Sequence, residues 1–153
     1  MTTATAKTSE TVHEAIAALQ RLAEAFFHRR EQLARDVGLS VEQWRVLEEI
    51  SDEHFMPSMF ARERRTSAAA VSKVIRQLIE KGLVVVGVSE TDGRQRDYTL
   101  TIEGRRAMAR LRTARQEAIA EVWGGLKSPE LVQFAKLSAS IADRMEAYAD
   151  KSD

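Results

Sequence analysis

Residues 66–104 constrain the fold more than any other part of the chain, because strong local signals follow one another there. Ser67 can cap a helix whose apolar side chains recur at helical spacing, at Val71, Val74, Ile75 and Leu78. Gly82 ends this helix, and the valine-rich run 83–88 predicts a strand. Asp92-Gly93 then predicts a tight turn, and residues 98–100 continue as a returning strand.

The order helix, strand, charged turn and strand is typical of a winged helix-turn-helix, a fold that binds DNA. The residues before it agree with this interpretation. Ser40 and Gln43 form a capping-box pattern that opens a helix, and Pro57 suits the first turn of a short helix through Arg65. We therefore predict a winged helix-turn-helix DNA-binding domain over residues 39–101.

The distribution of charge supports DNA binding, although the total does not. The 153 residues contain 23 Lys and Arg and 23 Asp and Glu, so the net charge is zero, whereas many nucleic-acid-binding domains are basic. Residues 62–96, however, contain four acidic and eight basic residues, the latter being Arg62, Arg64, Arg65, Lys73, Arg76, Lys81, Arg94 and Arg96. A basic face on a neutral chain orients a protein toward phosphates.

The two ends of the chain are predicted to form long amphipathic helices, over residues 10–38 and 102–150, after a disordered tail at 1–9. Their apolar residues recur at three- and four-residue steps. A single small winged helix cannot cover such long stripes, so we expect the terminal helices of two chains to pack together as a homodimer. The alternative is packing of these helices onto their own winged helix. The predicted class is mainly α with a small β-hairpin wing, flanked by N- and C-terminal dimerisation helices.

Several classes of function are excluded by what the sequence lacks. There is no cysteine, which removes disulfides, thiolate metal sites and thiol redox sensors. The three histidines have no metal-ligand spacing, and no phosphate loop or set of catalytic residues is present. There is also no apolar run long enough to span a membrane. We expect a cytoplasmic protein that binds without catalysis, and neither a metal nor a cofactor.

Residues 71–84, followed by Asp92-Gly93-Arg94 and by residues 100–104, resemble the MarR family of bacterial transcriptional regulators. The resemblance extends from the first long helix to the last. It implies a winged-helix homodimer that binds near-palindromic double-stranded DNA operators and is often released by small molecules. Two positions depart from the family pattern. The short helix before the recognition helix usually carries a Leu-Ala pair and a further leucine, whereas here Phe60-Ala61 is followed by Arg64 and Arg65. Val86 also replaces an arginine that is usual in the strand.

Three groups of residues are the candidate DNA contacts. The N-terminal part of a recognition helix reaches base edges in the major groove, which selects Ser67, Ala69, Ser72, Lys73 and Arg76. In the wing, Arg94 would enter the minor groove, Arg96 would add a phosphate contact, and Asp92 would support the shape of the turn by pairing with Arg94. Phosphate contacts from the preceding helix would come from Arg62, Arg64 and Arg65. The alternative for each group is an ordinary solvated surface.

The resemblance also places an effector in the crevice between the terminal helices and the winged helix. Phe27, His28 and Trp44 are the candidates to line it, because planar rings and a polar tip suit an aromatic or phenolic ligand. The alternative is that these aromatic side chains belong to the core or to the dimer seam. The function expected overall is a homodimeric regulator that binds specific DNA, a repressor released by a small molecule. The alternative is an architectural or protein-interaction module without its own operator.

Overall fold

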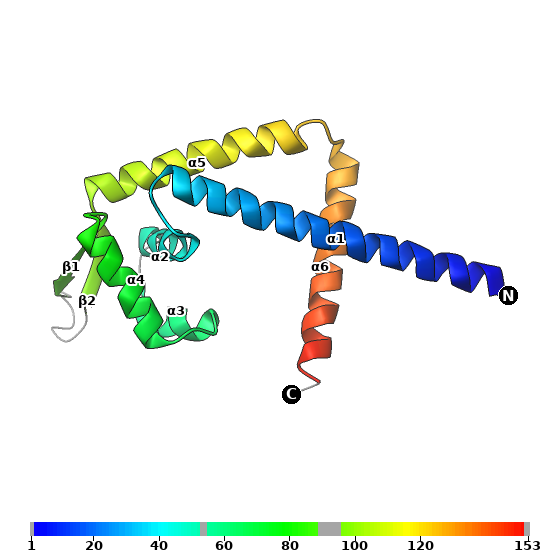
Figure 1. Ribbon diagram of the computed structural model, residues 1–153, viewed down its shortest axis with the longest axis horizontal. Helices are drawn as coiled ribbons and strands as arrows, with labels where there is room; N and C mark the ends of the chain where they lie inside the picture. Colours follow the sequence, from blue (N-terminus) through cyan, green and yellow to red (C-terminus); the bar gives the residue numbers. More distant parts are fainter. Residues whose placement is uncertain (1, 53–54, 89–95, 152–153) are drawn as a thin grey trace. The chain divides into compact units, whose positions relative to one another are not determined.

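The computed structural model of the chain describes residues 2–52, 55–88 and 96–151. These residues form six helices and one antiparallel two-stranded hairpin (Figure 1). In chain order the elements are α1 (Thr2–Asp36), α2 (Val41–Ser51), α3 (Pro57–Glu63), α4 (Ala68–Glu80), β1 (Val84–Val88), β2 (Arg96–Leu100), α5 (Ile102–Trp123) and α6 (Ser128–Ala149). The predicted class, mainly α with a β-hairpin wing in a winged helix-turn-helix, is confirmed.

The helix ends lie where local sequence signals predict them. Gly38 and Gly82 follow α1 and α4 with φ angles of 75° and 70°, a left-handed conformation that residues other than glycine adopt with difficulty. At the start of α2, Ser40 Oγ accepts from the backbone of Gln43 while the Gln43 side chain accepts from the backbone of Ser40. Local capping chemistry therefore sets these boundaries.

The N-terminal segment differs from the expected disordered tail at residues 1–9, since α1 begins at Thr2. Alanine and lysine are good helix formers and occur among residues 4–7. Side chains also bond to the preceding helical turn, Thr11 Oγ1 donating to Lys7 O at 3.0 Å and His13 Nδ1 to Ser9 O at 2.7 Å. The amphipathic helix is thus continued into a segment that has little apolar character of its own.

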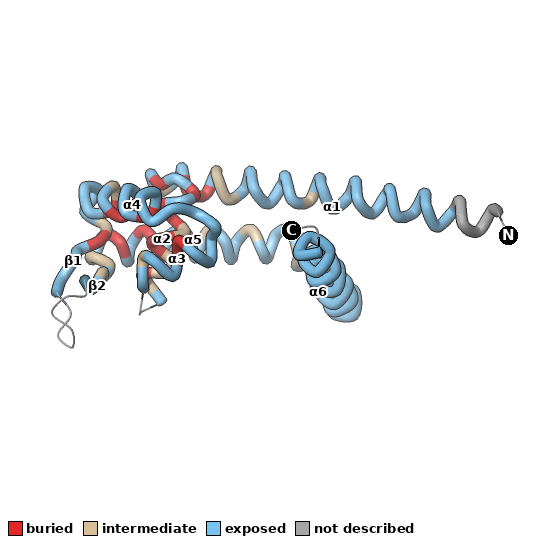
Figure 2. Tube along the Cα trace, turned by 90° about the horizontal axis from the view of Figure 1, so that it is seen from below, coloured by how far each residue is buried: buried red, intermediate tan, exposed pale blue. Residues whose placement is uncertain are grey.

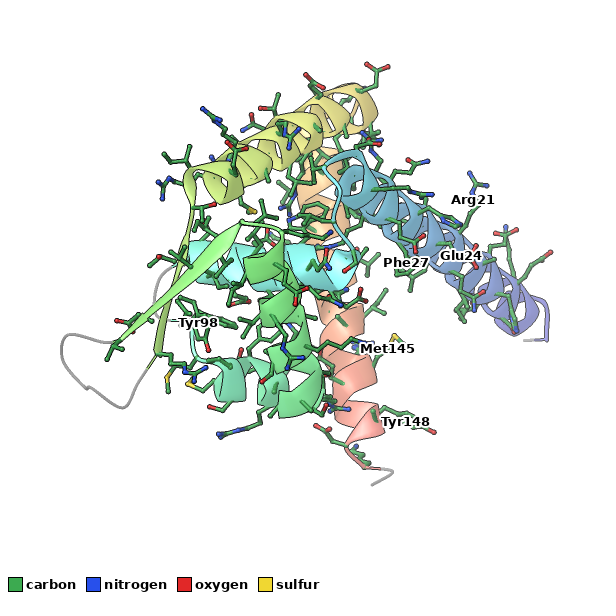
Figure 3. All side chains as sticks on the ribbon, turned by 60° about the vertical axis from the view of Figure 1, so that its left-hand side comes forward. Arg21, Glu24, Phe27, Tyr98, Met145 and Tyr148 are labelled. Atoms are coloured by element: carbon green, nitrogen blue, oxygen red, sulfur yellow. The ribbon has the colours of Figure 1, made fainter. Side chains whose placement is uncertain are left out.

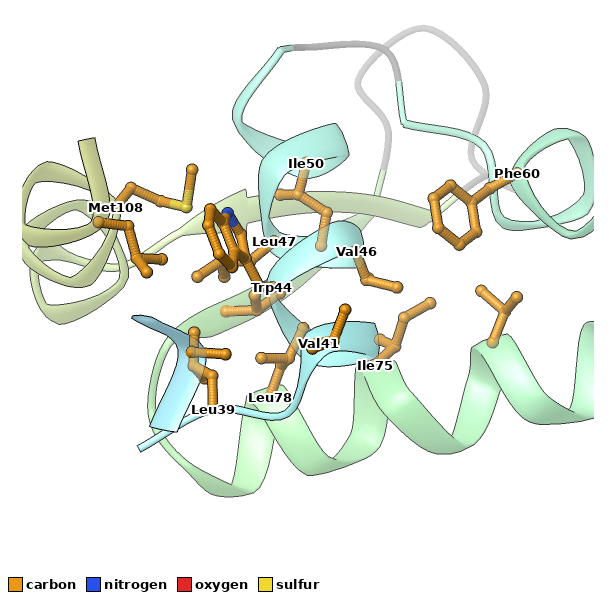
Figure 4. Close-up of a cluster of buried hydrophobic side chains, with 14 of the residues drawn as sticks. Leu39, Val41, Trp44, Val46, Leu47, Ile50, Phe60, Ile75, Leu78 and Met108 are labelled. Carbon is orange, nitrogen blue, oxygen red and sulfur yellow. The ribbon is translucent and has the colours of Figure 1, made fainter. Parts of the chain in front are cut away.

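The chain divides into two compact units, Met1–Ala114 and Arg115–Asp153. In the first unit, α4 packs against α2, α3 and β1, and β2 packs against α2. Figure 4 shows the core that results, with the buried side chains of α2 meeting those of α4 and α5. Leu47 and Leu78 are fully buried there. Burying a side chain of this kind contributes about 1.5–3 kcal/mol.

The hairpin is anchored at its base and exposed beyond it. Val84 pairs with Leu100 and is buried, whereas Val85, Val86 and Val88 are exposed. At the far end of the described strands, Val88 pairs with Arg96. The predicted Asp92-Gly93 turn lies outside the described residues.

The long helices carry apolar side chains that this chain leaves exposed. In Figure 2 the buried part of α1 is its C-terminal end, where Leu33 and Ala34 enter the core. None of the residues of α6 is buried, although Trp123 and Phe134 approach within the second unit, with ring centroids 5.9 Å apart. Figure 3 shows Phe27 on α1 and Met145 and Tyr148 on α6 among these exposed side chains.

Candidate nucleic-acid interface

The turn between α3 and α4 is short and closed by backbone hydrogen bonds. Phe60 and Ala61 fix α3 to the core, both being buried. The helix ends at Glu63, Arg64 follows as its C-cap, and Arg65 takes a φ of 50° to reverse the chain. The amide of Thr66 then donates to Ala61 O at 2.9 Å, which leads directly into Ser67.

Ser67 caps the N-terminus of α4 and fixes the direction of its first turn. Its Oγ accepts from the amide of Ala70 at 3.1 Å, as the sequence predicts for a cap. Val71, Ile75 and Leu78 face the core. The predicted base-contacting residues beyond the cap all lie on the exposed surface of the helix, namely Ala69, Ser72, Lys73 and Arg76. They form one polar and basic face opposite the core.

The basic residues of α3 and its turn are exposed but not equivalent. Arg64 is held by the protein itself, because its Nη2 lies 3.4 Å from Glu49 Oε1 and its guanidinium lies 5.7 Å from the centroid of the Phe60 ring. Arg62 and Arg65 are exposed, and Arg65 belongs to the turn. Two arginines are therefore presented to solvent, while the third also connects α3 to α2.

The wing residues divide between described and undescribed parts of the chain. Arg96 lies at the start of β2 and is exposed. Asp92 and Arg94 lie outside the described residues, so their predicted roles in the turn stay predictions. Below Arg96, the hairpin is fixed by an aromatic contact, since the rings of Tyr98 and Phe55 lie 5.9 Å apart and Phe55 also meets Phe60.

The hairpin is also joined to the start of α5. Thr101 Oγ1 donates to Gly82 O at 2.6 Å and accepts from the amide of Gly104 at 3.0 Å. A Cβ on Gly104 would lie 2.2 Å from Leu83 O, so only glycine allows this approach. Arg105 Nη1 donates to Leu100 O at 2.8 Å. The Thr101-Ile102-Glu103-Gly104 motif therefore ties the end of the wing to the helix that follows it.

The candidate effector residues do not share one surface. Phe27 and His28 are exposed on α1 with ring centroids 6.4 Å apart, and His28 Nδ1 lies 3.5 Å from Glu31. Trp44 is 3% exposed and belongs to the core, where the guanidinium of Arg30 covers its ring at 4.4 Å. The predicted effector site stays a prediction.

Sequence reasoning missed a polar connection beneath the recognition surface. Gln43 is 7% exposed, and its side chain contacts both Gln77 and Lys81, from the last turn and the end of α4. The capping box reveals Gln43 from sequence alone. Its second and third partners lie 34 and 38 residues away, which no local pattern predicts.

Metal-binding and membrane-spanning features are both absent from the described part of the chain. Within it, no group of three or more His, Asp and Glu residues is arranged to hold a metal ion. Nor does any described helix combine the length and apolar character needed to cross a bilayer.

Comparison with known proteins identifies this architecture. Residues 37–95 match the sequence profile of the MarR family. No curated protein matches the sequence. Among solved structures, a MarR family transcription regulator superposes with a TM-score of 0.84 and 18% identity, over 96% of this chain and 98% of that one.

Two further structures were solved with a bound molecule. A complex of S. aureus MepR with DNA has a TM-score of 0.67 and 15% identity, over 84% of this chain and 94% of that one. CouR from Rhodococcus jostii RHA1, bound to p-coumaroyl-CoA, has a TM-score of 0.65 and 22% identity, over 82% of this chain and 89% of that one. Residues 37–95 thus match the MarR family, as the sequence predicts, and the chain has the fold of MarR family transcription regulators.

Proposed function

We propose that this chain is a homodimeric transcriptional regulator that binds a specific DNA operator. The observation that carries the proposal is the exposed face of α4, where Ser72, Lys73 and Arg76 lie opposite the buried Val71, Ile75 and Leu78. An α-helix of this kind fits the major groove, where arginine can bind guanine through two hydrogen bonds. The DNA complex of MepR, which has the same fold, supports DNA binding by a protein of this fold.

The exposed arginines around α4 would position it on the duplex. Arg62 and Arg65 on one side and Arg96 on the other are exposed and carry the charge that phosphates attract. Arg64 would contribute more to the structure of α3, since it already pairs with Glu49. Arg94 would enter the minor groove, supported by Asp92, as the sequence predicts.

We further propose that the regulator is a repressor released by a small molecule. Binding would be lost if the ligand favours a conformation in which the two recognition helices of the dimer no longer match the operator. The structure of CouR with p-coumaroyl-CoA supports ligand binding within this fold. An aromatic or phenolic compound remains the class expected here, with Phe27 and His28 as candidate contacts.

The test is fluorescence anisotropy with the DNA upstream of the protein's own gene, compared with random duplex of the same length. We expect Arg76→Ala to cost about 1–3 kcal/mol at the operator and to relax the preference at one base pair. Lys73→Ala should weaken both duplexes and reduce the slope of log K against log salt by about one.

The outcome also decides between this proposal and its alternative. If wild-type protein binds random duplex as tightly as the upstream DNA, the chain is an architectural or protein-interaction module. If neither substitution alters binding to a preferred site, α4 is not the recognition helix.

A further inference from the structure

The ends of α1 and α4 meet at one polar group beneath the recognition surface. The ammonium of Lys81, the residue that follows α4, donates to Gly38 O at 2.5 Å and to Gln43 Oε1 at 3.0 Å. Gly38 lies just past α1, and Gln43 lies in the first turn of α2. A single lysine therefore contacts the segment that joins α1 to α2.

The position of Lys81 has an electrostatic reason. Both α1 and α4 end beside it, and the last carbonyl groups of a helix carry partial negative charge. Gly38 and Gly82 close the two helices in the same left-handed conformation, and Gly38 O, just past the end of α1, is the carbonyl that accepts from Lys81. An ammonium placed between two such ends favours their approach, which would otherwise bring like partial charges together.

Gln43 extends this contact into α4 with a defined direction. Its Oε1 accepts from the Ser40 amide at 3.1 Å and from Lys81, so this atom must be the carbonyl oxygen. The amide group Nε2 then points to Gln77 and donates to its Oε1 at 3.0 Å. The link from the start of α2 to the last turn of α4 thus has one donor and one acceptor at each step.

These hydrogen bonds restrain the rotation and axial position of α4 relative to α2, which apolar packing alone restrains weakly. The contacts of Val71, Ile75 and Leu78 with the core are apolar and have little directional preference. Hydrogen bonds require defined distances and angles, so Gln77 and Lys81 fix the rotation and axial position of α4 relative to α2. Gln77 directly follows Arg76, so a small rotation at Gln77 displaces the guanidinium that would meet the base.

We propose that Gln43, Gln77 and Lys81 are positioning residues that join the end of α1 to the recognition helix. A displacement of the α1–α2 segment is then transmitted to Arg76 through hydrogen bonds rather than through the core. The proposal rests on the proposed function, since it assumes that α4 reads DNA. The three residues themselves need not touch DNA.

The test compares one disruptive and one conservative change at the same site, together with a change at Lys81. Gln77→Leu removes the acceptor, whereas Gln77→Glu keeps an oxygen that accepts from Gln43 and adds a favourable i, i+4 pair with Lys81. Lys81→Met keeps the length of the side chain and removes its donors. Anisotropy with the operator and with random duplex, over a series of salt concentrations, gives the specificity ratio for each variant.

We expect Gln77→Leu and Lys81→Met to lower the ratio of operator to random affinity about fivefold, and Gln77→Glu to keep it. The salt slope on random duplex should stay at its wild-type value in Lys81→Met. A slope reduced by about one would instead make Lys81 a phosphate contact and overturn the proposal. An unchanged specificity ratio in both disruptive variants would overturn it as well.

Hydrogen exchange provides a readout that does not depend on DNA. The Ser40 amide donates to Gln43, so we expect faster exchange of this proton in Gln77→Leu and in Lys81→Met than in Gln77→Glu. Equal exchange in all variants would contradict the link even if the protein binds its operator. If wild-type protein shows no operator preference but Ser40 exchanges as expected, the proposed function fails while the structural link stands.

Discussion

At the scale of single residues, Arg65 is the position where conformation and charge are in conflict. Among the described residues it is the one non-glycine residue with positive φ, at 50°. A left-handed conformation costs a residue with a Cβ about 1–2 kcal/mol. Glycine would relieve this cost, yet the chain has an exposed arginine at the reversal between α3 and α4. We expect the charge to be kept for contact with phosphate at the expense of stability.

Substitution of Arg65 should therefore separate stability from DNA binding. Arg65→Gly should raise the free energy of unfolding by about 0.5–1 kcal/mol, because relief of strain exceeds the entropy that glycine adds to the unfolded chain. The same change should weaken DNA binding and reduce the salt slope. Chemical denaturation and anisotropy measure the two effects.

Arg65→Ala is the matched control, since it removes the charge and keeps the strain. It should weaken DNA binding as much as Arg65→Gly without the gain in stability. Unchanged DNA binding in both variants would show that Arg65 is only part of a solvated surface.

At the scale of elements, the junction of the hairpin with α5 depends on close contact between backbones. The amide of Thr101 donates to Leu83 O at 3.0 Å, and Gly104 lies against the same carbonyl. The first turn of α5 thus closes over the residue that leads from α4 into β1. The wing and the recognition helix are both tied to α5 at this point.

Gly104→Ala should break this junction. The added Cβ would lie 2.2 Å from a backbone oxygen, so α5 must shift, and we expect a loss of about 1–3 kcal/mol in the free energy of unfolding. Gly125→Ala is the control, because a Cβ added there would have no atom within 4 Å and the φ of Gly125 is not positive. Thermal or urea unfolding compares the two, and equal stabilities would contradict the close contact.

The elements themselves were predictable because their signals are local. Gly38, the Ser40 and Gln43 capping box, Ser67 and Gly82 each act within a few residues, and each marks the boundary that it predicts. The family motif, which spans several elements, indicates the order in which they combine. These signals were sufficient for the fold and for the exposed face of α4.

The contacts between distant segments were not predictable in the same way. Arg64 pairs with Glu49, and Lys81 with Gln43, through side chains whose sequence positions carry no sign of their partners. From the sequence, Trp44 could line an effector site or belong to the core or the dimer seam. The packing of α1 against α2 buries it in the core. Exposure and ion pairing depend on tertiary structure, which periodicity alone does not contain.

At the scale of the molecule, the apolar side chains of the long helices are the main feature that one chain leaves unsatisfied. On α1, the face that enters the core through Leu33 and Ala34 continues toward the N-terminus as Val12, Ile16 and Leu19, which are 50%, 49% and 44% exposed. On α6, the apolar stripe includes Leu137, Ile141 and Met145, all of them exposed. Surfaces of this length favour burial against a second copy of the chain.

A charge placed within the α6 stripe should therefore dissociate the proposed homodimer. Ile141→Glu should lower the association constant at least about tenfold, because an ionised side chain would have to be buried in an apolar seam. Ala139→Glu changes the charge equally on the far side of the helix and should leave association unchanged. Sedimentation equilibrium measures both, and a monomeric wild-type protein at micromolar concentration would contradict the dimer.

The exposed valines of β1 have a consequence for how the protein behaves in concentrated solution. Between Val84 and Val88 the strand contains neither a charge nor a proline, which are two of the features that keep a strand edge from pairing with strands of other molecules. Its partner β2 carries Arg96 and Asp97 and is better protected. Aggregation through added strands should therefore begin at β1, and Val86→Lys, at a position where the family usually has arginine, should suppress it.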